Sequence, residues 1–200
     1  MDEAIFLEQT HKATGLSIVL TSIEEKHIQH LILLARDRDL IDLMGWDTFF
    51  ELEDTEKFIQ NISTFVLPYS RDSQPLVLGI YLEQTSPPIG YAVLKGINRD
   101  LLTAEVGIAI LDRKHRNRGY GRLALQRMTI YAFSELSLQT IGSTILLSNR
   151  VSINMCKRVG FSVREIMAES WSMPNGEIVD MVWMELTKEA WLKREKKKIY

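Results

Sequence analysis

Cysteine is nearly absent from this sequence: Cys156 is the single one among 200 residues. One thiol cannot form an intramolecular disulfide, which excludes a disulfide-stabilised secreted scaffold and suits a reducing compartment. The sequence also lacks any run of about 18 apolar residues that could cross a membrane, and its first residues lack the basic start and apolar core of a signal peptide. These absences predict a cytoplasmic protein with no membrane partner.

An excess of charge of one sign is also missing. The 24 basic and 26 acidic side chains leave a net charge of −2, whereas a domain that binds nucleic acid is normally strongly basic. We therefore expect no nucleic-acid partner. No His, Cys, Asp or Glu spacing indicates a metal site. Hydrophobic residues at 46% and charged residues at 25% are typical of a globular protein with a substantial core.

Hydrophobic periodicity divides the chain into a helix-rich first part and a strand-rich second part. A strand at 17–21 precedes helical patterns, with Ser22 expected to cap the first of them and a later helix expected to begin near Thr55. From residue 76 onward, strand-like segments alternate with two amphipathic helical segments and end at a Pro-Asn-Gly turn. The strand-like segments are 76–83, 89–97, 102–111, 141–148, 161–173 and 178–186, and the helical ones are 123–136 and 153–159. This order predicts one mixed α+β domain that begins its strand-rich part with an antiparallel meander.

Residues 116–122 lie between the strand-like residues before them and the amphipathic helix after them. The first N–H groups of a helix have no intrahelical partner and carry partial positive charge, so they suit a phosphate. Gly119 and Gly121 remove side chains that would keep a ligand away from the backbone, and three arginines surround them. We predict that this loop binds the pyrophosphate of a cofactor, with a solvated run of charge as the alternative interpretation.

Two motifs resemble those of the GNAT superfamily of acyl-CoA N-acyltransferases. Residues 105–110 followed by Arg116, Gly119 and Gly121 resemble its central motif, which reads Arg or Gln, two residues, Gly, any residue, then Gly or Ala. Further on, residues 149–161 resemble the family's Asn…Leu-Tyr-x-Lys-x-Gly-Phe segment. The strand near residue 18 and the closing hairpin with Asp180 resemble the branch that acetylates ribosomal-protein N-termini and polyamines.

The resemblance covers residues 17–187, which leaves residues 1–16 as an N-terminal extension and residues 188–200 as a basic tail, helical in composition. It implies a strongly twisted, mostly antiparallel seven-stranded sheet, with parallel fourth and fifth strands that splay apart and about four flanking helices. It also implies acetyl-CoA as the cofactor, with pantetheine in the splay. The residues that would bind it are Ile108, Ala109 and Ile110 on the fourth strand, Arg116, Asn117, Arg118, Gly119, Tyr120, Gly121 and Arg122 around the pyrophosphate, Asn149 and Asn154 beside pantetheine, and Lys157 or Arg158 at the 3′-phosphate.

Acetyl transfer to an amine requires the amine to lose a proton and the departing thiolate to be protonated or stabilised. Glu105 stands where the resemblance implies a base, and a solvent-facing strand residue is the alternative. Cys156 stands where the resemblance implies a tyrosine acting as general acid. A thiol could donate a proton through a bridging water, but we favour the interpretation that Cys156 is a small buried hydrophobe.

The sequence therefore predicts an N-acetyltransferase that uses a ternary complex and direct attack by a primary amine. The acceptor would be a protein N-terminus, a polyamine or another small amine, and an acidic cluster at Glu51, Glu53, Asp54 and Glu56 could attract a cationic one. Because Cys156 replaces tyrosine, the alternative is a catalytically weakened CoA-binding sensor or interaction protein. A homodimer is a habit of the family and does not follow from these residues.

Overall fold

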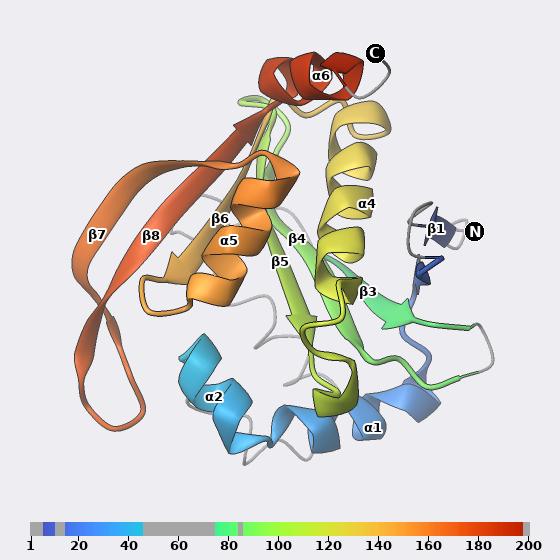
Figure 1. The fold of residues 1–200 in the computed structure, drawn as a ribbon, viewed down its shortest axis with the longest axis vertical. Coiled ribbons are helices and arrows are strands. Elements are labelled where there is room, and N and C mark those ends of the chain that lie inside the picture. Colours follow the sequence, from blue (N-terminus) through green and yellow to red (C-terminus); the bar gives the residue numbers. More distant parts are fainter. Residues whose placement is uncertain (1–5, 11–14, 46–74, 84–85, 198–200) are drawn as a thin grey trace.

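The computed structural model describes residues 6–10, 15–45, 75–83 and 86–197 (Figure 1). In chain order the elements are β1 (Phe6–Thr10), β2 (Ser17–Thr21), α1 (Glu25–Ala35), α2 (Arg38–Met44), β3 (Leu76–Tyr81), β4 (Gly90–Asn98), β5 (Thr103–Ile110), the 3₁₀ turn η2 (Arg113–His115), α4 (Tyr120–Ser134), β6 (Thr140–Leu146), α5 (Arg150–Val159), β7 (Ser162–Ser172), β8 (Ile178–Thr187) and α6 (Lys188–Lys197).

The strands among the described residues all belong to one sheet with the order β1-β2-β3-β4-β5-β6-β8-β7. Neighbouring strands are antiparallel except β5 and β6, which are parallel. The predicted meander is confirmed as β3, β4 and β5, and the turn with Gly176 at a φ of 85° joins β7 to β8. The fold is therefore the mixed α+β fold that the sequence predicts.

The parallel pairing of β5 with β6 is short. It joins Thr103, Ala104 and Glu105 to residues 140–142 and goes no further within these described strands. Since β5 continues to Ile110 and β6 to Leu146, the two strands part after Glu105, as Figure 1 shows. The predicted splay is confirmed.

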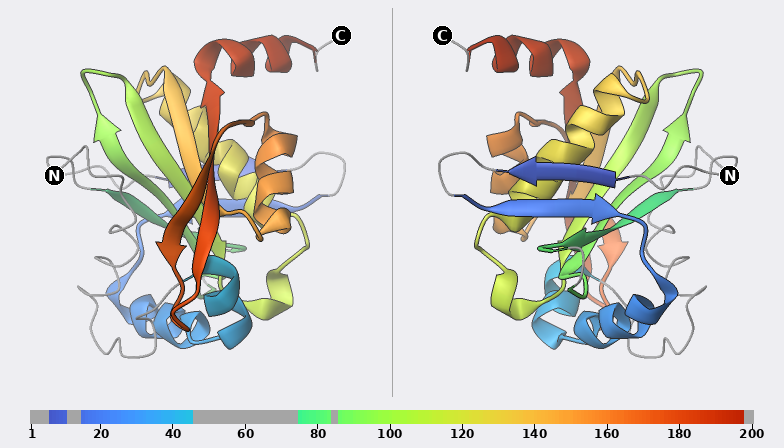
Figure 2. Two further views of the ribbon diagram at one scale, coloured as in Figure 1. Left: turned by 90° about the vertical axis from the view of Figure 1, so that its left-hand side faces the viewer. Right: turned by 90° about the vertical axis from the view of Figure 1, so that its right-hand side faces the viewer.

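Alternation of side chains along the strands gives the sheet two buried faces. On one face, α4 and α5 cover the larger apolar cluster, to which Leu94 and Val106 of the sheet contribute. On the other face, α1 packs over a smaller cluster that includes Val93 and Ala109. Figure 2 shows α4 and α5 on the opposite side of the sheet from α1. The sheet, with its splay, thus lies between two buried apolar layers.

The structure corrects three details of the predicted fold. The sheet has eight strands rather than seven, because part of the predicted N-terminal extension forms β1. The described residues contain five α-helices rather than about four, since α2 and the tail helix α6 both form. Helix α1 begins after Glu24, which makes no side-chain capping bond, so Ser22 is not its cap. The helix predicted near Thr55 and the acidic cluster at 51–56 lie outside the described residues.

Strand β1 was missed because its five residues show no clear alternation. It forms by pairing along the edge of β2 (Figure 2), and Leu7 is buried beneath it in the larger apolar cluster. The tail helix α6 also packs on the domain, because the Trp191 ring of α6 lies 5.4 Å from the Phe133 ring of α4, centroid to centroid. Within the described ranges, none of the helices has the length and hydropathy needed to span a bilayer.

Replacing Leu7 with alanine tests whether β1 is an integral part of the sheet. Loss of a buried leucine side chain should lower the free energy of unfolding by about 2 kcal/mol. The exposed neighbour Glu8 gives the matched control, since Glu8→Ala should change stability by less than about 0.5 kcal/mol. Urea unfolding measures both, and equal effects would show that β1 does not contribute to the core.

Candidate active site

The segment between β5 and α4 turns sharply to place the start of the helix. Asn117 and Gly119 both have left-handed backbone conformations, with φ values of 60° and 97°. A Cβ atom at Gly121 would lie 3.2 Å from the Met155 sulfur of α5 and 3.6 Å from Ile110 Cγ1 of β5. The first turn of α4 therefore lies close to both neighbours, and a side chain at Gly121 would require the Met155 side chain to shift.

Backbone donors at this turn are available to an anion. The first intrahelical bond at the start of α4 runs from Leu123 N–H to Gly119 O at 3.1 Å. The N–H groups of Tyr120 and Gly121 precede it, so they have no acceptor within the helix, and the helix dipole adds positive charge there. This arrangement fits the pyrophosphate that the sequence predicts for this segment.

The Arg116 side chain is engaged in contacts within the protein, so its predicted contact with the pyrophosphate stays a prediction. Its Nε donates to Ile110 O at 3.0 Å, one terminal nitrogen donates to Leu111 O, and the other lies 2.8 Å from Asp37 Oδ2. The side chain is only 17% exposed. Arg116 thus ties the end of β5 to the segment between α1 and α2, and these contacts occupy all three guanidinium nitrogens.

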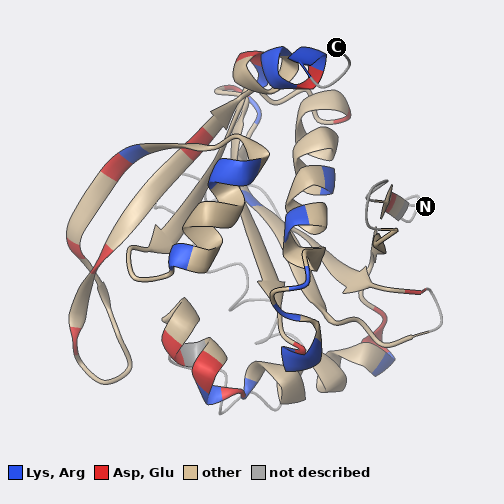
Figure 3. Cartoon of the chain, in the orientation of Figure 1, with Lys and Arg blue, Asp and Glu red and all other residues tan. Residues whose placement is uncertain are grey.

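The other predicted residues of the segment are more open. Asn117 and Arg118 are exposed, and Arg122 is partly buried in the first turn of α4. The Tyr120 ring packs edge-on against His115, with centroids 5.9 Å apart. Figure 3 shows basic residues along the segment before α4 and at both ends of α5. Positive charge therefore remains around the helix start even though Arg116 is engaged.

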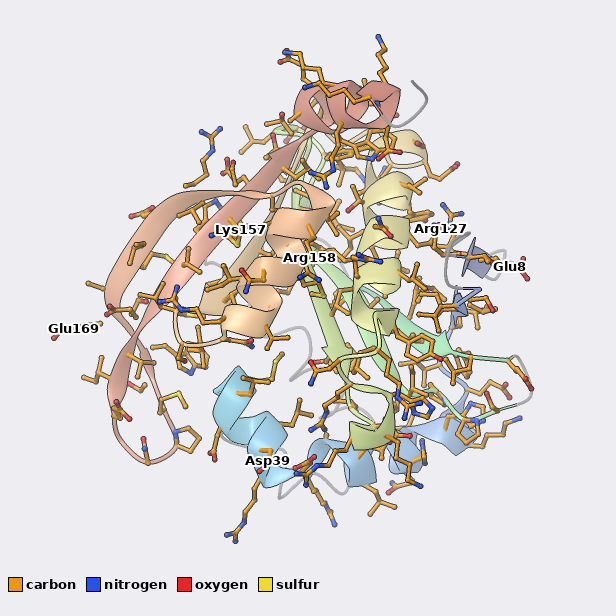
Figure 4. The ribbon with its side chains drawn as sticks, in the orientation of Figure 1. Glu8, Asp39, Arg127, Lys157, Arg158 and Glu169 are labelled. Atoms are coloured by element: carbon orange, nitrogen blue, oxygen red, sulfur yellow. The ribbon has the colours of Figure 1, made fainter. Side chains whose placement is uncertain are left out.

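The α5 residues separate into a buried cap and an exposed side. Asn149 caps α5, accepting from Ser152 N–H at 3.0 Å, and its amide donates to Leu43 O at 3.2 Å. Its predicted contact with pantetheine therefore competes with two protein contacts. Asn154 and Lys157 are exposed on α5, as is Arg158 (Figure 4). Their predicted contacts with CoA are consistent with this exposure.

Strand β5 offers an open edge beyond its last pair with β6. Ile108, Ala109 and Ile110 pair with β4 on one side, and on the other side they face the splay. Alternate N–H and C=O groups of an extended strand point to each side. The backbone groups that point away from β4 can therefore pair with an extended ligand, as predicted for pantetheine.

Glu105 lies at the last paired position of β5, directly at the start of the splay. Its carboxylate Oε1 lies 3.6 Å from Lys95 Nζ and accepts from Thr144 N–H at 3.3 Å. The Glu105 side chain is only 9% exposed, so the solvent-facing alternative is wrong. Burial raises the pKa of Glu105, and the positive charge of Lys95 opposes that rise.

Lys95 and Thr144 were not recognised from the sequence. Lys95 was detectable in principle, because it is the one charged residue in the strand-like segment 89–97 and the meander places that segment opposite Glu105. Thr144 was not detectable, since the bond from its backbone N–H to Glu105 depends on where β5 and β6 part. Together they make Glu105 part of a buried polar cluster on the face of the sheet opposite α4.

Cys156 points from α5 into the apolar cluster and is 1% exposed. Its thiol has a side-chain hydrogen bond with Ser143, and burial raises its pKa to about 12. At neutral pH the thiol is therefore protonated and enclosed by apolar side chains. The geometry favours the packing interpretation of Cys156.

An aromatic ring covers the sheet beside Glu105. A Cβ atom on Gly142 would lie 2.0 Å from the Trp183 ring, and the Trp183 indole donates to Glu185 Oε1 at 2.8 Å. Because Gly142 is the register partner of Glu105, this ring and the carboxylate share one face. The Trp183 ring therefore lies next to Glu105 on the face of the sheet opposite α4.

Three features occur together here. Backbone N–H groups at the start of α4 are free of helical partners on one face, the parallel strands β5 and β6 part, and a carboxylate is buried on the other face. This combination is the architecture of an acyl-CoA-dependent acyltransferase. The chain belongs to the GNAT acetyltransferase family, because the family model described as "Acetyltransferase (GNAT) domain" matches residues 17–162. The enzyme class is therefore an acetyltransferase with acetyl-CoA as its cosubstrate.

Known proteins of similar sequence and structure agree with this class. The chain is 23% identical to an uncharacterized N-acetyltransferase, p20, of Bacillus licheniformis over 87% of this chain and 94% of that one. The crystal structure of spermidine N-acetyltransferase from Vibrio cholerae in complex with CoA and spermine shares its fold, with a TM-score of 0.70 and 22% identity over 88% of this chain and 98% of that one. A probable acetyltransferase has a TM-score of 0.68 and 20% identity over 87% and 94% of the two chains.

Two arginines of the segment before α4 should respond differently to replacement by alanine. Arg116→Ala leaves the Asp37 carboxylate and two carbonyl oxygens without their donor, so unfolding free energy should fall by about 2 kcal/mol. Arg118→Ala removes an exposed charge and should leave stability within about 0.5 kcal/mol, while weakening CoA binding. Calorimetric titration with CoA and thermal unfolding separate the effects, and unchanged CoA affinity in Arg118→Ala would remove this residue from the binding site.

Proposed function

We propose that this protein transfers the acetyl group of acetyl-CoA to a primary amine by direct attack in a ternary complex. The observation that supports this most strongly is the parting of β5 and β6 directly at Glu105. The opening lies between the anion-binding start of α4 and a buried carboxylate on the opposite face. A donor and an acceptor bound from opposite faces would meet there.

The cofactor, when bound, supplies an acetyl group activated as a thioester. The N–H groups of Tyr120 and Gly121 would hold its pyrophosphate, and Arg118 would add charge. The open edge of β5 from Ile108 to Ile110 would align the pantetheine arm. Lys157 would reach the 3′-phosphate at the other end of the cofactor. Backbone geometry and exposure support these roles. Holding the reactants in attack geometry is worth roughly 7–11 kcal/mol of barrier.

Glu105 would act as the base that takes a proton from the acceptor ammonium, directly or through a water. An alkylammonium has a pKa of about 10.4, so the amine is unreactive until this proton leaves. As the nitrogen–carbon bond forms and the carbon–sulfur bond breaks, the second amine proton is also lost. One proton finally resides on the CoA sulfur, and the other returns through Glu105 to solvent.

The acceptor class is proposed to be a small cationic amine of the polyamine type. The spermidine N-acetyltransferase of similar fold supports this class, and the Trp183 ring beside Glu105 could contact a cationic or methylene-rich chain. A protein N-terminus is the second acceptor, which an assay can distinguish directly.

A panel of acceptors tests the proposal. Purified protein with acetyl-CoA should acetylate at least one of spermidine, spermine, a lysine-like amine or an N-terminal peptide, as measured by CoA thiol release and product mass. Glu105→Gln should reduce turnover by about 100-fold while CoA affinity stays constant. Saturable CoA binding without turnover on any acceptor would instead support the alternative of a CoA-binding sensor or interaction protein, which rests on the replacement of tyrosine by Cys156.

Replacing Cys156 with alanine tests whether the thiol takes part in the reaction. Because the thiol is enclosed and its pKa is raised to about 12, Cys156→Ala should keep turnover within about twofold and lose about 1 kcal/mol of stability from the small cavity. Steady-state kinetics across pH and thermal unfolding provide the measurements. A large fall in kcat with a changed alkaline limb would assign Cys156 as the general acid.

A further inference from the structure

We infer that Lys95 is a positioning residue for the acetyl transfer, holding the Glu105 carboxylate in its charged form and in place at the point where β5 and β6 part. The inference rests on the proposed function, since it concerns the base of that reaction. Lys95 acts through Glu105 and is not proposed to touch the substrate.

The register of the sheet brings the two side chains together. Lys95 of β4 and Glu105 of β5 are direct cross-strand partners, so they point to the same face. The ion pair of Lys95 Nζ with Glu105 Oε1 spans 3.6 Å, and the side chains are 5% and 9% exposed. Beyond this pair the β4–β5 register shifts, between Lys95 and Asn98. The regular pairing of β4 with β5 therefore ends at Lys95 and Glu105, and Glu105 is also the last residue of β5 that pairs with β6.

A third strand completes the arrangement. Thr144 N–H, from the part of β6 that no longer pairs with β5, donates to the same Glu105 oxygen at 3.3 Å. The carboxylate therefore has a cation from β4 and an amide from β6 on either side of it. These two contacts restrict its orientation at the start of the splay, where an acceptor amine would need its base.

Stability alone does not explain a charged pair here. The nearest cross-strand pair on the same face is Val93, which is apolar and buried, with Gly107, and an apolar pair of similar size at positions 95 and 105 would avoid the desolvation of two charges. Replacing a buried ion pair by packed hydrophobic residues is often neutral or stabilising. The buried pair therefore points to a chemical use for the carboxylate.

Lys95 is the cation that acts on Glu105 among the described residues. On the same face, Glu185 of β8 lies beyond Gly142, but its carboxylate is paired with Arg164 at 2.8 Å and with the Trp183 indole. Helix α2, which contacts β6, carries its charged residues on exposed positions; these are Arg38, Asp39 and Asp42. Burial raises the pKa of Glu105, and Lys95 is the charge that opposes this rise.

Removing the positive charge of Lys95 should therefore shift the acidic limb of the pH–rate profile. In Lys95→Met the pKa of Glu105 rises further, so the carboxylate is protonated over more of the acidic range. We expect kcat/KM at pH 7 to fall by about tenfold or more and to recover as pH increases. Lys95→Arg keeps a positive charge and should keep the acidic limb closer to that of the wild type.

The matched control is Arg164→Met, which removes the exposed ion-pair partner of Glu185 and should leave the pH profile unchanged. The double variant Lys95→Met/Glu105→Gln carries neither charge and should be folded by circular dichroism. Relative to Glu105→Gln alone, it should show no further loss of activity if Lys95 works through Glu105. A further loss, or a loss in Lys95→Met that is equal at every pH, would overturn the inference.

A readout without an acceptor separates this inference from the proposed function. Carbon-13 NMR of protein labelled at the glutamate carboxyl follows the titration of Glu105, which the Glu105→Gln spectrum identifies. Its midpoint should shift to higher pH in Lys95→Met, and an unchanged midpoint would overturn the role of Lys95. Absence of wild-type turnover on every amine would instead overturn the proposed function.

Discussion

The parting of β5 and β6 is the constraint on which the other features of this structure depend. Only three residue pairs join the two strands, yet neither strand is left alone, because β5 stays paired with β4 and β6 with β8. Each strand keeps one full set of backbone hydrogen bonds, so the sheet opens without losing its continuity. The facing backbone groups in the gap still need partners. An extended ligand with amide groups would satisfy them, as the proposed pantetheine site requires.

The splay between β5 and β6 also separates two kinds of chemical group, one on each face of the sheet. On the α4 face, helix geometry supplies N–H groups, and Arg116 is used internally to hold the segment that presents them. On the other face, the strands supply a carboxylate whose charge is balanced within the sheet by Lys95. In the proposed function, recognition of an anion would rely on the backbone, and proton transfer would rely on one buried side chain. The separation explains why few residues on either face serve both tasks.

The local sequence pattern predicts much of this fold. The features that it does not predict depend on contacts between residues far apart in the sequence. Alternating apolar residues predict the meander, and two glycines before an amphipathic segment predict the anion-binding turn. The role of Arg116 could not be predicted, because its partner Asp37 is 79 residues away in the sequence. Leu7 likewise becomes part of a strand only through the edge of β2. Asn149 illustrates both cases, since its cap of α5 is local but its bond to Leu43 is not.

The replacement of tyrosine by Cys156 is compatible with catalysis because the two proton transfers are unequal. An alkylammonium, with a pKa of about 10.4, must lose a proton before its nitrogen can attack. A thiolate, whose conjugate acid has a pKa of about 8.5, is a good leaving group at neutral pH and can take a proton from water afterwards. Losing a side-chain acid on α5 therefore costs less than losing the base on β5. The buried Lys95–Glu105 pair and the buried thiol thus agree with the proposed site, in which the base would provide most of the chemical assistance.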